Sequence, residues 1–216
     1  MILPFQAEAD ITTAIPLVQS HLQRGGVLAY PTETVYGLGT EATDAALDSL
    51  ANLKGRPPRK PFLLLVSSLA MADACGLVFN QPARVLAAEF WPGPLTLVLR
   101  GGEGRLPDRL RGAEGGIAVR WTSHRAVARL IARMGQPLTS TSANRPGGPP
   151  APGAERLVEL FPNAVADGTL LVLDGGVLGN VPPSTLVDCT GPLPRLVREG
   201  AIPRSELRRR AGSMAP

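Results

Sequence analysis

Apolar side chains near the N-terminus recur with the period of an amphipathic helix. Those on the apolar face are Ile11, Ile15, Val18 and Leu22. Asp10 precedes them as a candidate N-cap, Pro16 is placed to delay the start, and Gly25-Gly26 ends the pattern. A second helix is predicted from Thr43, a candidate cap, to Lys54, so this lysine lies where the helix gives way to a loop.

Short continuous apolar runs alternate with further helical patterns along the rest of the chain. The runs, typical of strands buried on both faces, cover residues 27–30, 62–66, 95–99, 117–119, 170–173 and 186–187. Helical patterns lie between them near 82–90, 124–134 and 154–161. This alternation predicts an α/β domain built on a twisted, at least partly parallel sheet.

The composition is that of a soluble globular protein, with 44% apolar and 19% charged residues. Aromatic residues make up only 4%, which argues against a base-stacking surface, and the net charge of +4 favours anionic partners such as a nucleotide or RNA. Cys75 and Cys189 are isolated in the sequence, so a reduced cytoplasmic protein is expected. Neither a signal peptide nor a membrane span is predicted, since no apolar run approaches ~20 residues.

Lysine is scarce, and its placement points to a site. The chain has twenty arginines but only two lysines, Lys54 and Lys60, both within one seven-residue basic stretch. A lysine ammonium is a compact point charge that can follow a phosphate during reaction. A solvated basic loop is the alternative interpretation.

Two polar segments follow predicted strands, where open α/β sheets bind ligands. Segment 30–39 places hydroxyls and a carboxylate among turn residues, and segment 139–144 has four consecutive hydroxyls followed by an amide, a set that suits phosphate oxygens. Arg120 ends a predicted strand, where it can clamp a carboxylate. Ordinary strand-end loops and a surface ion pair are the alternatives. Walker, dinucleotide-binding, zinc-protease and serine-hydrolase motifs are absent.

Taken together and in order, six segments resemble the YrdC/Sua5 family, over roughly residues 10 to 203. They are the decade beginning at Tyr30, Lys54-Gly55-Arg56-Pro57, Trp91-Pro92-Gly93-Pro94-Leu95-Thr96, Ser142-Ala143-Asn144, Ser184-Thr185-Leu186-Val187-Asp188 and the stretch from Leu196 to Ile202. The resemblance implies a YrdC-like α/β fold, a twisted open mixed sheet with flanking helices around a basic concave groove. Residues 1–203 would form the catalytic domain and residues 204–216 a short basic tail, helical or frayed.

The resemblance also implies an activity. Family members are nucleotidyltransferases that make threonylcarbamoyl-AMP and pyrophosphate from L-threonine, bicarbonate and ATP, for the t6A modification at position 37 of tRNA. Mg²⁺ is expected with ATP, with no dedicated protein ligand site. Proteins that transfer the threonylcarbamoyl group downstream are the expected partners, together with weak tRNA or RNA binding through the basic groove.

Site residues carry over position by position from the resemblance. Those implied at the nucleotide are Lys54 and Arg56, which are also the catalytic pair, with Lys60, Ser142, Asn144 and Arg198. Those implied around threonine are Thr32, Arg120, Ser140 and Ser184. Two-domain members often have Asn at the position of Lys60 and His at that of Leu65, so Leu65 is expected to remove a polar group near threonine. The chain ends soon after Arg198, as in the single-domain type.

Two other functions are open on the sequence alone. A related domain in hydrogenase maturation makes a carbamoyl-adenylate, but within a much longer protein. The basic charge and the arginine-rich tail also fit an RNA-binding or ribosome-maturation protein.

Overall fold

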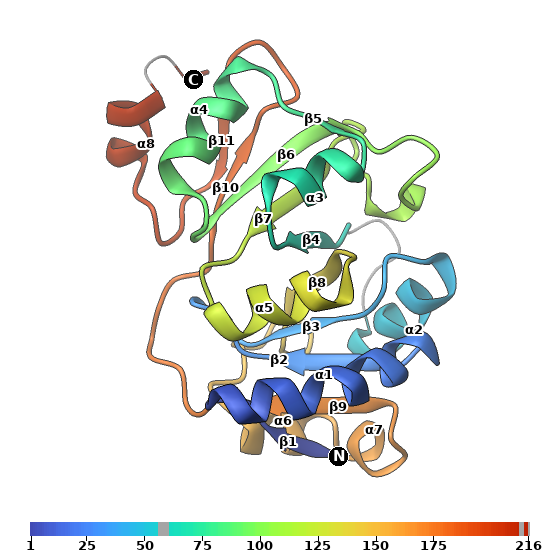
Figure 1. Cartoon of the computed structure of the whole chain (residues 1–216). Coiled ribbons are helices and arrows are strands. Elements are labelled where there is room, and N and C mark those ends of the chain that lie inside the picture. Colours follow the sequence, from blue (N-terminus) through green and yellow to red (C-terminus); the bar gives the residue numbers. More distant parts are fainter. Residues whose placement is uncertain (56–60, 212–213, 216) are drawn as a thin grey trace.

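An eleven-stranded mixed sheet runs the length of the molecule, with helices packed along it (Figure 1). The computed structural model describes residues 1–55, 61–211 and 214–215. The strands are β1 (Ile2–Pro4), β2 (Val27–Tyr30), β3 (Gly37–Gly39), β4 (Leu63–Val66), β5 (Leu77–Val78), β6 (Leu95–Gly101), β7 (Ile117–Trp121), β8 (Leu138–Ser142), β9 (Leu170–Asp174), β10 (Thr185–Asp188) and β11 (Arg195–Arg198). The α-helices are α1 (Glu8–Gln23), α2 (Asp44–Lys54), α3 (Leu69–Ala74), α4 (Gln81–Phe90), α5 (Arg125–Met134), α6 (Ala154–Leu160), α7 (Pro162–Ala166) and α8 (Arg204–Ala211), and η1 (Asp108–Leu110) is a 3₁₀ turn.

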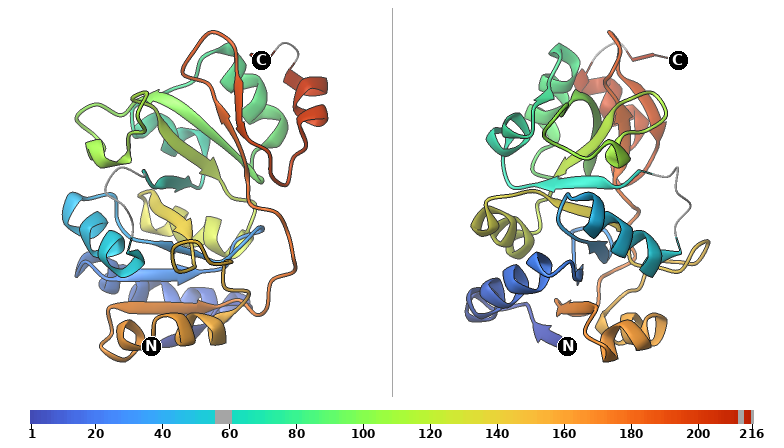
Figure 2. Two further views of the ribbon diagram at one scale, coloured as in Figure 1. Left: turned by 180° about the vertical axis from the view of Figure 1, so that it is seen from behind. Right: turned by 90° about the vertical axis from the view of Figure 1, so that its right-hand side faces the viewer.

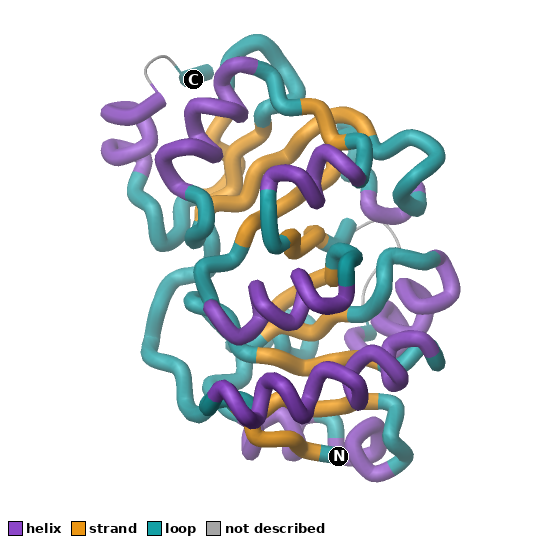
Figure 3. The backbone as a smooth tube through the Cα atoms, in the orientation of Figure 1, coloured by secondary structure: helices purple, strands orange, loops and turns teal. Residues whose placement is uncertain are grey.

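The sheet is open and mixes parallel with antiparallel pairs. Its strand order is β1-β9-β2-β3-β8-β4-β7-β6-β10-β11, with β5 paired to β6 off this path. The strands are the orange segments of Figure 3. The pairs β1/β9, β2/β9, β4/β7 and β6/β10 are parallel, and the other neighbours are antiparallel. The predicted α/β fold with a partly parallel sheet is therefore confirmed.

Helices cover both faces of the half of the sheet that holds the N-terminus. On one face α1 packs against α5, and together with β2 and β4 they enclose an apolar cluster that includes Val18, Leu130 and Leu65. Helices α2, α6 and α7 pack against β2 and β9 from the opposite side, as the right-hand view of Figure 2 shows. In the other half, α3 and α4 pack on β4, β5 and β6. Apolar strands buried between helices explain the continuous apolar runs in the sequence.

The predicted helix starts are confirmed at α2 and wrong at α1. The Thr43 side chain accepts a hydrogen bond from the Ala46 amide, as an N-cap does. Helix α1 instead begins after Ala7, and Asp10 lies in its first turn, where its carboxylate accepts from the amide of Ala7 at 2.8 Å. Pro16 lies inside α1 without delaying its start. Asp10 thus supplies a helix-start signal from the third helical position rather than from the cap.

The strands that the apolar pattern predicted are all present, but several others gave no such signal. Strand β8 is the Thr/Ser segment that the sequence placed after a strand, and β3 has the sequence Gly-Leu-Gly. Gly39 is required there, because a Cβ would come 1.9 Å from the Thr139 carbonyl oxygen. These small residues allow β3 and β8 to approach each other closely.

The C-terminal helix α8 is docked rather than frayed. Leu207 is completely buried and joins the main apolar core, and Arg210 pairs with Glu89 of α4 at 3.3 Å. The basic tail beyond residue 203 therefore packs against α4, in the half of the molecule away from the N-terminus. Within the described part of the chain, the helices are too short or too polar to cross a membrane.

Candidate active site

A cavity of about 570 Å³ extends over the sheet from β3 to β11. All seven strands from β3 to β11 in sheet order contribute at least one lining residue. Alternate residues of a strand share a face, and Thr96 with Val98 and Ala118 with Arg120 line the cavity in this way. Its volume is in the range of small-molecule sites.

The cavity brings together every sequence-predicted site residue that the structure describes. Its lining includes Thr32, Lys54, Arg120, Ser140, Ser142, Asn144, Ser184 and Arg198. Arg56 and Lys60 lie outside the described residues. These lining positions come from segments spread over the whole chain, so the fold gathers a set that the sequence scatters.

At one end of the cavity, Lys54 is tied to the segment after β8. Helix α2 ends at Lys54 because Gly55 adopts a left-handed conformation, with φ of 61°. The Lys54 ammonium donates to the carbonyls of Ser142 and Asn144 and to the Asn144 side-chain oxygen. Ser142 Oγ also donates to that oxygen at 2.8 Å, and the Asn144 amide group donates to the Gly148 carbonyl. A buried cation thus organises the polar turn.

A second charged group lies across the sheet on β7. Arg120 Nη2 is 2.7 Å from Glu33 Oε1, and both terminal nitrogens of Arg120 donate to Thr34 Oγ1 at 3.3 Å. Burial alone would raise the pKa of Glu33, but the Arg120 charge and the hydrogen bonds from Thr122 and Arg120 hold it below its usual value. Glu33 is therefore ionised at neutral pH, and the pair is charged.

Thr32 stabilises the loop between β2 and β3, which also holds Glu33 and Thr34. Its hydroxyl donates to the Val35 carbonyl at 2.6 Å and accepts from the amides of Thr34 and Val35 at 3.2 Å. These bonds close the turn between β2 and β3. The Thr34 hydroxyl lies 3.0 Å from that of Thr32 and reaches Arg120, so Thr34 is a lining residue that sequence reasoning did not single out.

The third charged group of the cavity is Arg198 on the edge strand β11. Its Nη2 donates to the Ser184 carbonyl at 2.8 Å, while the Ser184 hydroxyl is 2.8 Å from that of Thr96. Burial in the cavity, and then the positive charge of Arg120, lower the pKa of Arg198. Two guanidinium groups thus face a shared space with one carboxylate beside them, an arrangement that favours an anionic ligand.

Leu65 is the strand partner of Arg120 in the β4/β7 pair, and the expectation that it removes a polar group near threonine stays a prediction. Its side chain is 1% exposed and packs in the apolar cluster with Tyr30, Leu138 and α5, and the described lining of the cavity does not include it. Leu63, two residues earlier, lines the cavity instead.

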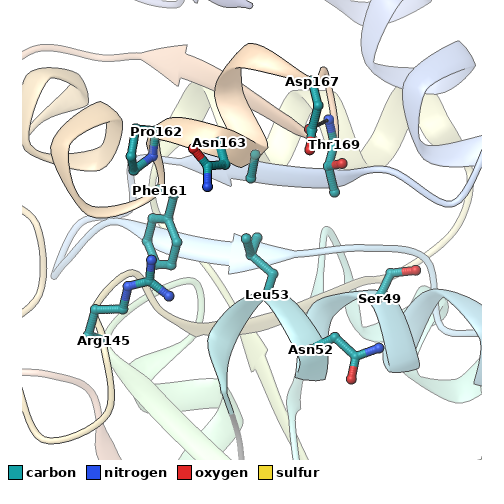
Figure 4. Close-up of a pocket in the computed structure, with 10 residues that line it drawn as sticks. Ser49, Asn52, Leu53, Arg145, Phe161, Pro162, Asn163, Asp167 and Thr169 are labelled. Carbon is teal, nitrogen blue, oxygen red and sulfur yellow. Dashed lines mark hydrogen bonds between the residues drawn. The ribbon is translucent and has the colours of Figure 1, made fainter.

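A smaller cavity, about 470 Å³, lies beside α2 and the α6–α7 corner (Figure 4). The Arg145 guanidinium lies 4.6 Å from the centre of the Phe161 ring, and Figure 4 shows Leu53 pointing toward the same space. The eight described site residues do not line it. The larger cavity is therefore the candidate active site.

Comparisons with known proteins show the family of the chain. The model of the Sua5/YciO/YrdC family, described as "Telomere recombination", matches residues 20–200. The chain belongs to the Sua5/YciO/YrdC family. Within this family, threonylcarbamoyl-AMP synthase of Chromohalobacter salexigens is 42% identical over 170 residues, which are 77% of this chain and 88% of that protein.

Two further matches come from Pyrococcus abyssi, one a protein sequence and the other a solved structure. Its threonylcarbamoyl-AMP synthase is 33% identical over 201 residues, 93% of this chain but only 58% of the relative. A crystal structure of P. abyssi Sua5 in complex with L-threonine has a TM-score of 0.89 and 31% identity, covering 99% of this chain and 62% of that one. The chain therefore spans less than two thirds of the length of these P. abyssi matches.

Proposed function

We propose that the protein is an L-threonylcarbamoyladenylate synthase, which forms threonylcarbamoyl-AMP and pyrophosphate from L-threonine, bicarbonate and ATP. The observation that carries the proposal is the joint lining of one cavity by all eight described site residues. Relatives named for this activity, and a family structure that holds L-threonine, support the same substrates. The product would serve the t6A modification at position 37 of tRNA.

The two charged ends of the cavity suggest how the substrates divide it. Lys54 with the Ser142–Asn144 turn would meet the triphosphate, joined by Arg56 and Lys60 of the adjoining segment, and Arg198 would lie beside the nucleotide. Arg120 would receive the threonine carboxylate, near Thr32, Thr34, Ser140 and Ser184. A guanidinium can donate two parallel hydrogen bonds to a carboxylate, whereas a compact ammonium suits a phosphate whose charge shifts during reaction.

The reaction needs charge stabilisation more than a covalent nucleophile. The threonine amine would add to bicarbonate with loss of water, and an oxygen of the resulting carbamate would attack the α-phosphorus of ATP. The bond from that phosphorus to the β-phosphate oxygen breaks, and pyrophosphate leaves. Negative charge grows on the α-phosphoryl oxygens and on the leaving group, where fixed cations lower the barrier. Lys54 and Arg56 would supply that charge.

Mg²⁺ would enter as part of MgATP. The described lining of the cavity holds hydroxyls and amides but no carboxylate, and no group of three acidic, histidine or cysteine side chains clusters among the described residues. The metal would therefore be held by triphosphate oxygens and water, as Mg²⁺ commonly is. Weak tRNA or RNA binding, downstream threonylcarbamoyl-transfer proteins and a cytoplasmic location complete the proposal.

The test is pyrophosphate release by the purified protein. We expect release from ATP only when L-threonine and bicarbonate are both present, and serine should support it roughly ten- to two-hundredfold less well, because it lacks one methyl contact. Equal release without threonine would contradict the proposal. A carbamoyl-adenylate synthase would not need threonine. An RNA-binding protein would give a salt-sensitive tRNA shift without turnover.

A further inference from the structure

Arg120 is held in a buried, incompletely satisfied position. Its side chain is 5% exposed, and its terminal nitrogens are used by Glu33 and Thr34. Its Nε is buried and has no hydrogen-bond acceptor among the described residues. A buried donor without a partner is costly, so its retention beside a ligand cavity indicates a ligand acceptor there.

Glu33 is fixed from the side away from Arg120. Oε2 accepts from the Thr122 hydroxyl, Oε1 accepts from the Ser123 amide at 3.2 Å, and the Thr122 hydroxyl in turn accepts from the His124 amide at 3.1 Å. These donors belong to the segment that joins β7 to α5. Glu33 itself is not among the residues that line the cavity. Its carboxylate is therefore anchored to a rigid junction and faces the arginine.

We propose that Glu33 is the positioning residue of the threonine subsite: it holds the Arg120 guanidinium in the orientation that receives the amino-acid carboxylate, without touching the amino acid itself. The inference rests on the proposed function. Thr34 alone cannot do this, because its one oxygen is shared between two nitrogens of Arg120 at 3.3 Å, longer than the 2.7 Å ion pair.

Glu33 would also explain why Arg120 binds threonine while the other cations of the cavity bind the nucleotide. Its negative charge offsets that of Arg120, whereas Arg198 has no acidic partner among the ion pairs of the described residues. A guanidinium already paired to a carboxylate is a weak site for a triphosphate, but Arg120 can still donate to a single carboxylate from Nε and from the second N–H of Nη1. The pair would therefore direct threonine to Arg120 and leave the more highly charged nucleotide to the other cations.

The test compares Glu33→Gln with Asp188→Asn by calorimetric titration of L-threonine, in the presence of a non-hydrolysable ATP analogue. Asp188 is a matched control, since it is also a mostly buried carboxylate paired with an arginine, Arg195, at 2.9 Å, but lies outside the cavity lining. We expect Glu33→Gln to weaken threonine binding roughly ten- to hundredfold and analogue binding little, because a misplaced binding group loses its partner. Asp188→Asn should change neither.

The outcomes separate this inference from the proposed function. If the wild-type protein does not bind threonine, the proposed function fails; if it does and Glu33→Gln binds threonine equally well, only the positioning role is overturned. Should Glu33→Gln not fold, Thr122→Val decides, since it removes one support of Glu33 and keeps the ion pair. A loss of roughly two- to tenfold in threonine affinity is expected for Thr122→Val, and unchanged affinity would overturn the proposal.

Discussion

Lys54 donates to Asn144 twice, to its backbone carbonyl at 2.8 Å and to its side-chain oxygen. With the Ser142 carbonyl, the described residues supply an acceptor for each of the three protons that the ammonium can donate. For Lys54 to reach a phosphate, it must give up at least one of these oxygens. Nucleotide binding and the conformation of the Ser142–Asn144 turn are therefore expected to be coupled.

The first prediction concerns the reactivity of Lys54. The residue is 5% exposed, so an acylating reagent should modify it far more slowly than the exposed N-terminal amine, even without ATP. Mass spectrometry can resolve the two lysines of the chain separately. Equal labelling rates of Lys54 and the N-terminal amine in folded, nucleotide-free protein would show that the ammonium is not held as described.

Lys54→Arg provides a functional counterpart. A planar guanidinium cannot direct donors to three oxygens grouped around one point, so we expect loss of most pyrophosphate-forming activity although the positive charge remains. Lys54→Met removes both charge and donors and should be no more active than Lys54→Arg. Near-normal turnover by Lys54→Arg would mean that charge alone is required at this position.

Arg120→Lys should raise the apparent KM for threonine by roughly tenfold or more while changing that for ATP little. The lysine preserves a positive partner for Glu33 but loses the forked geometry that fits a carboxylate. Steady-state kinetics with each substrate varied in turn would measure the effect. Arg100→Lys, at an exposed position of β6 outside the described lining of the cavity, is the control and should leave both constants unchanged. A KM effect of Arg120→Lys confined to ATP would move Arg120 to the nucleotide.

The C-terminal helix should contribute to stability. Leu207→Ala removes a fully buried side chain, so a loss of about 2–5 kcal/mol in the free energy of unfolding is expected. Leu193→Ala, at a position 49% exposed, should change it by less than about 0.5 kcal/mol. Denaturant unfolding of both variants tests this. Equal, small effects would mean that α8 is not docked on α4.

Stability should fall as the pH is lowered from about 7 to 5. Burial lowers the pKa of His21 in the folded protein, and its Nε2 lies 2.9 Å from the Val27 carbonyl, a contact that the neutral ring already makes. Since the folded pKa lies below the unfolded value, the unfolded chain binds protons first, and the stabilisation present above the unfolded pKa is lost as the pH falls. His124 has a pKa lowered for the same reason.

His21→Gln tests the contribution of this residue. The glutamine amide can still donate to a carbonyl but does not titrate, so the melting temperature should depend less steeply on pH than in the wild-type protein. Thermal melts across this pH range give the comparison. Identical slopes for the two proteins would show that His21 does not carry the effect.

Much of the fold follows from local patterns in the sequence, whereas the network behind the site does not. The apolar runs gave the buried strands, and Thr43 gave the start of α2, because these signals depend on neighbouring residues. Strand β3 escaped prediction because its glycines serve a close approach to β8 rather than a strand propensity. Local pattern is informative only where local energetics decide the structure.

In the site, too, some features could be predicted from the sequence and others could not. The eight described residues that the resemblance implied line one cavity, but the resemblance did not give the partner of Arg120, which is Glu33, 87 positions away along the chain. A three-residue run of Thr32, Glu33 and Thr34 does not reveal which hydroxyl closes the turn and which faces the arginine. In the structure, Thr32 closes the turn and Thr34 reaches Arg120.

The most direct test of the account is to identify the nucleotide product. The purified protein would be incubated with MgATP, L-threonine and either ordinary or ¹³C-labelled bicarbonate, and the products separated at once by liquid chromatography and mass spectrometry. We predict a threonine-dependent nucleotide with the mass of threonylcarbamoyl-AMP that becomes heavier by one neutron with the labelled bicarbonate. Formation of AMP or ADP alone, or a product mass that is the same with and without the label, would contradict the central claim.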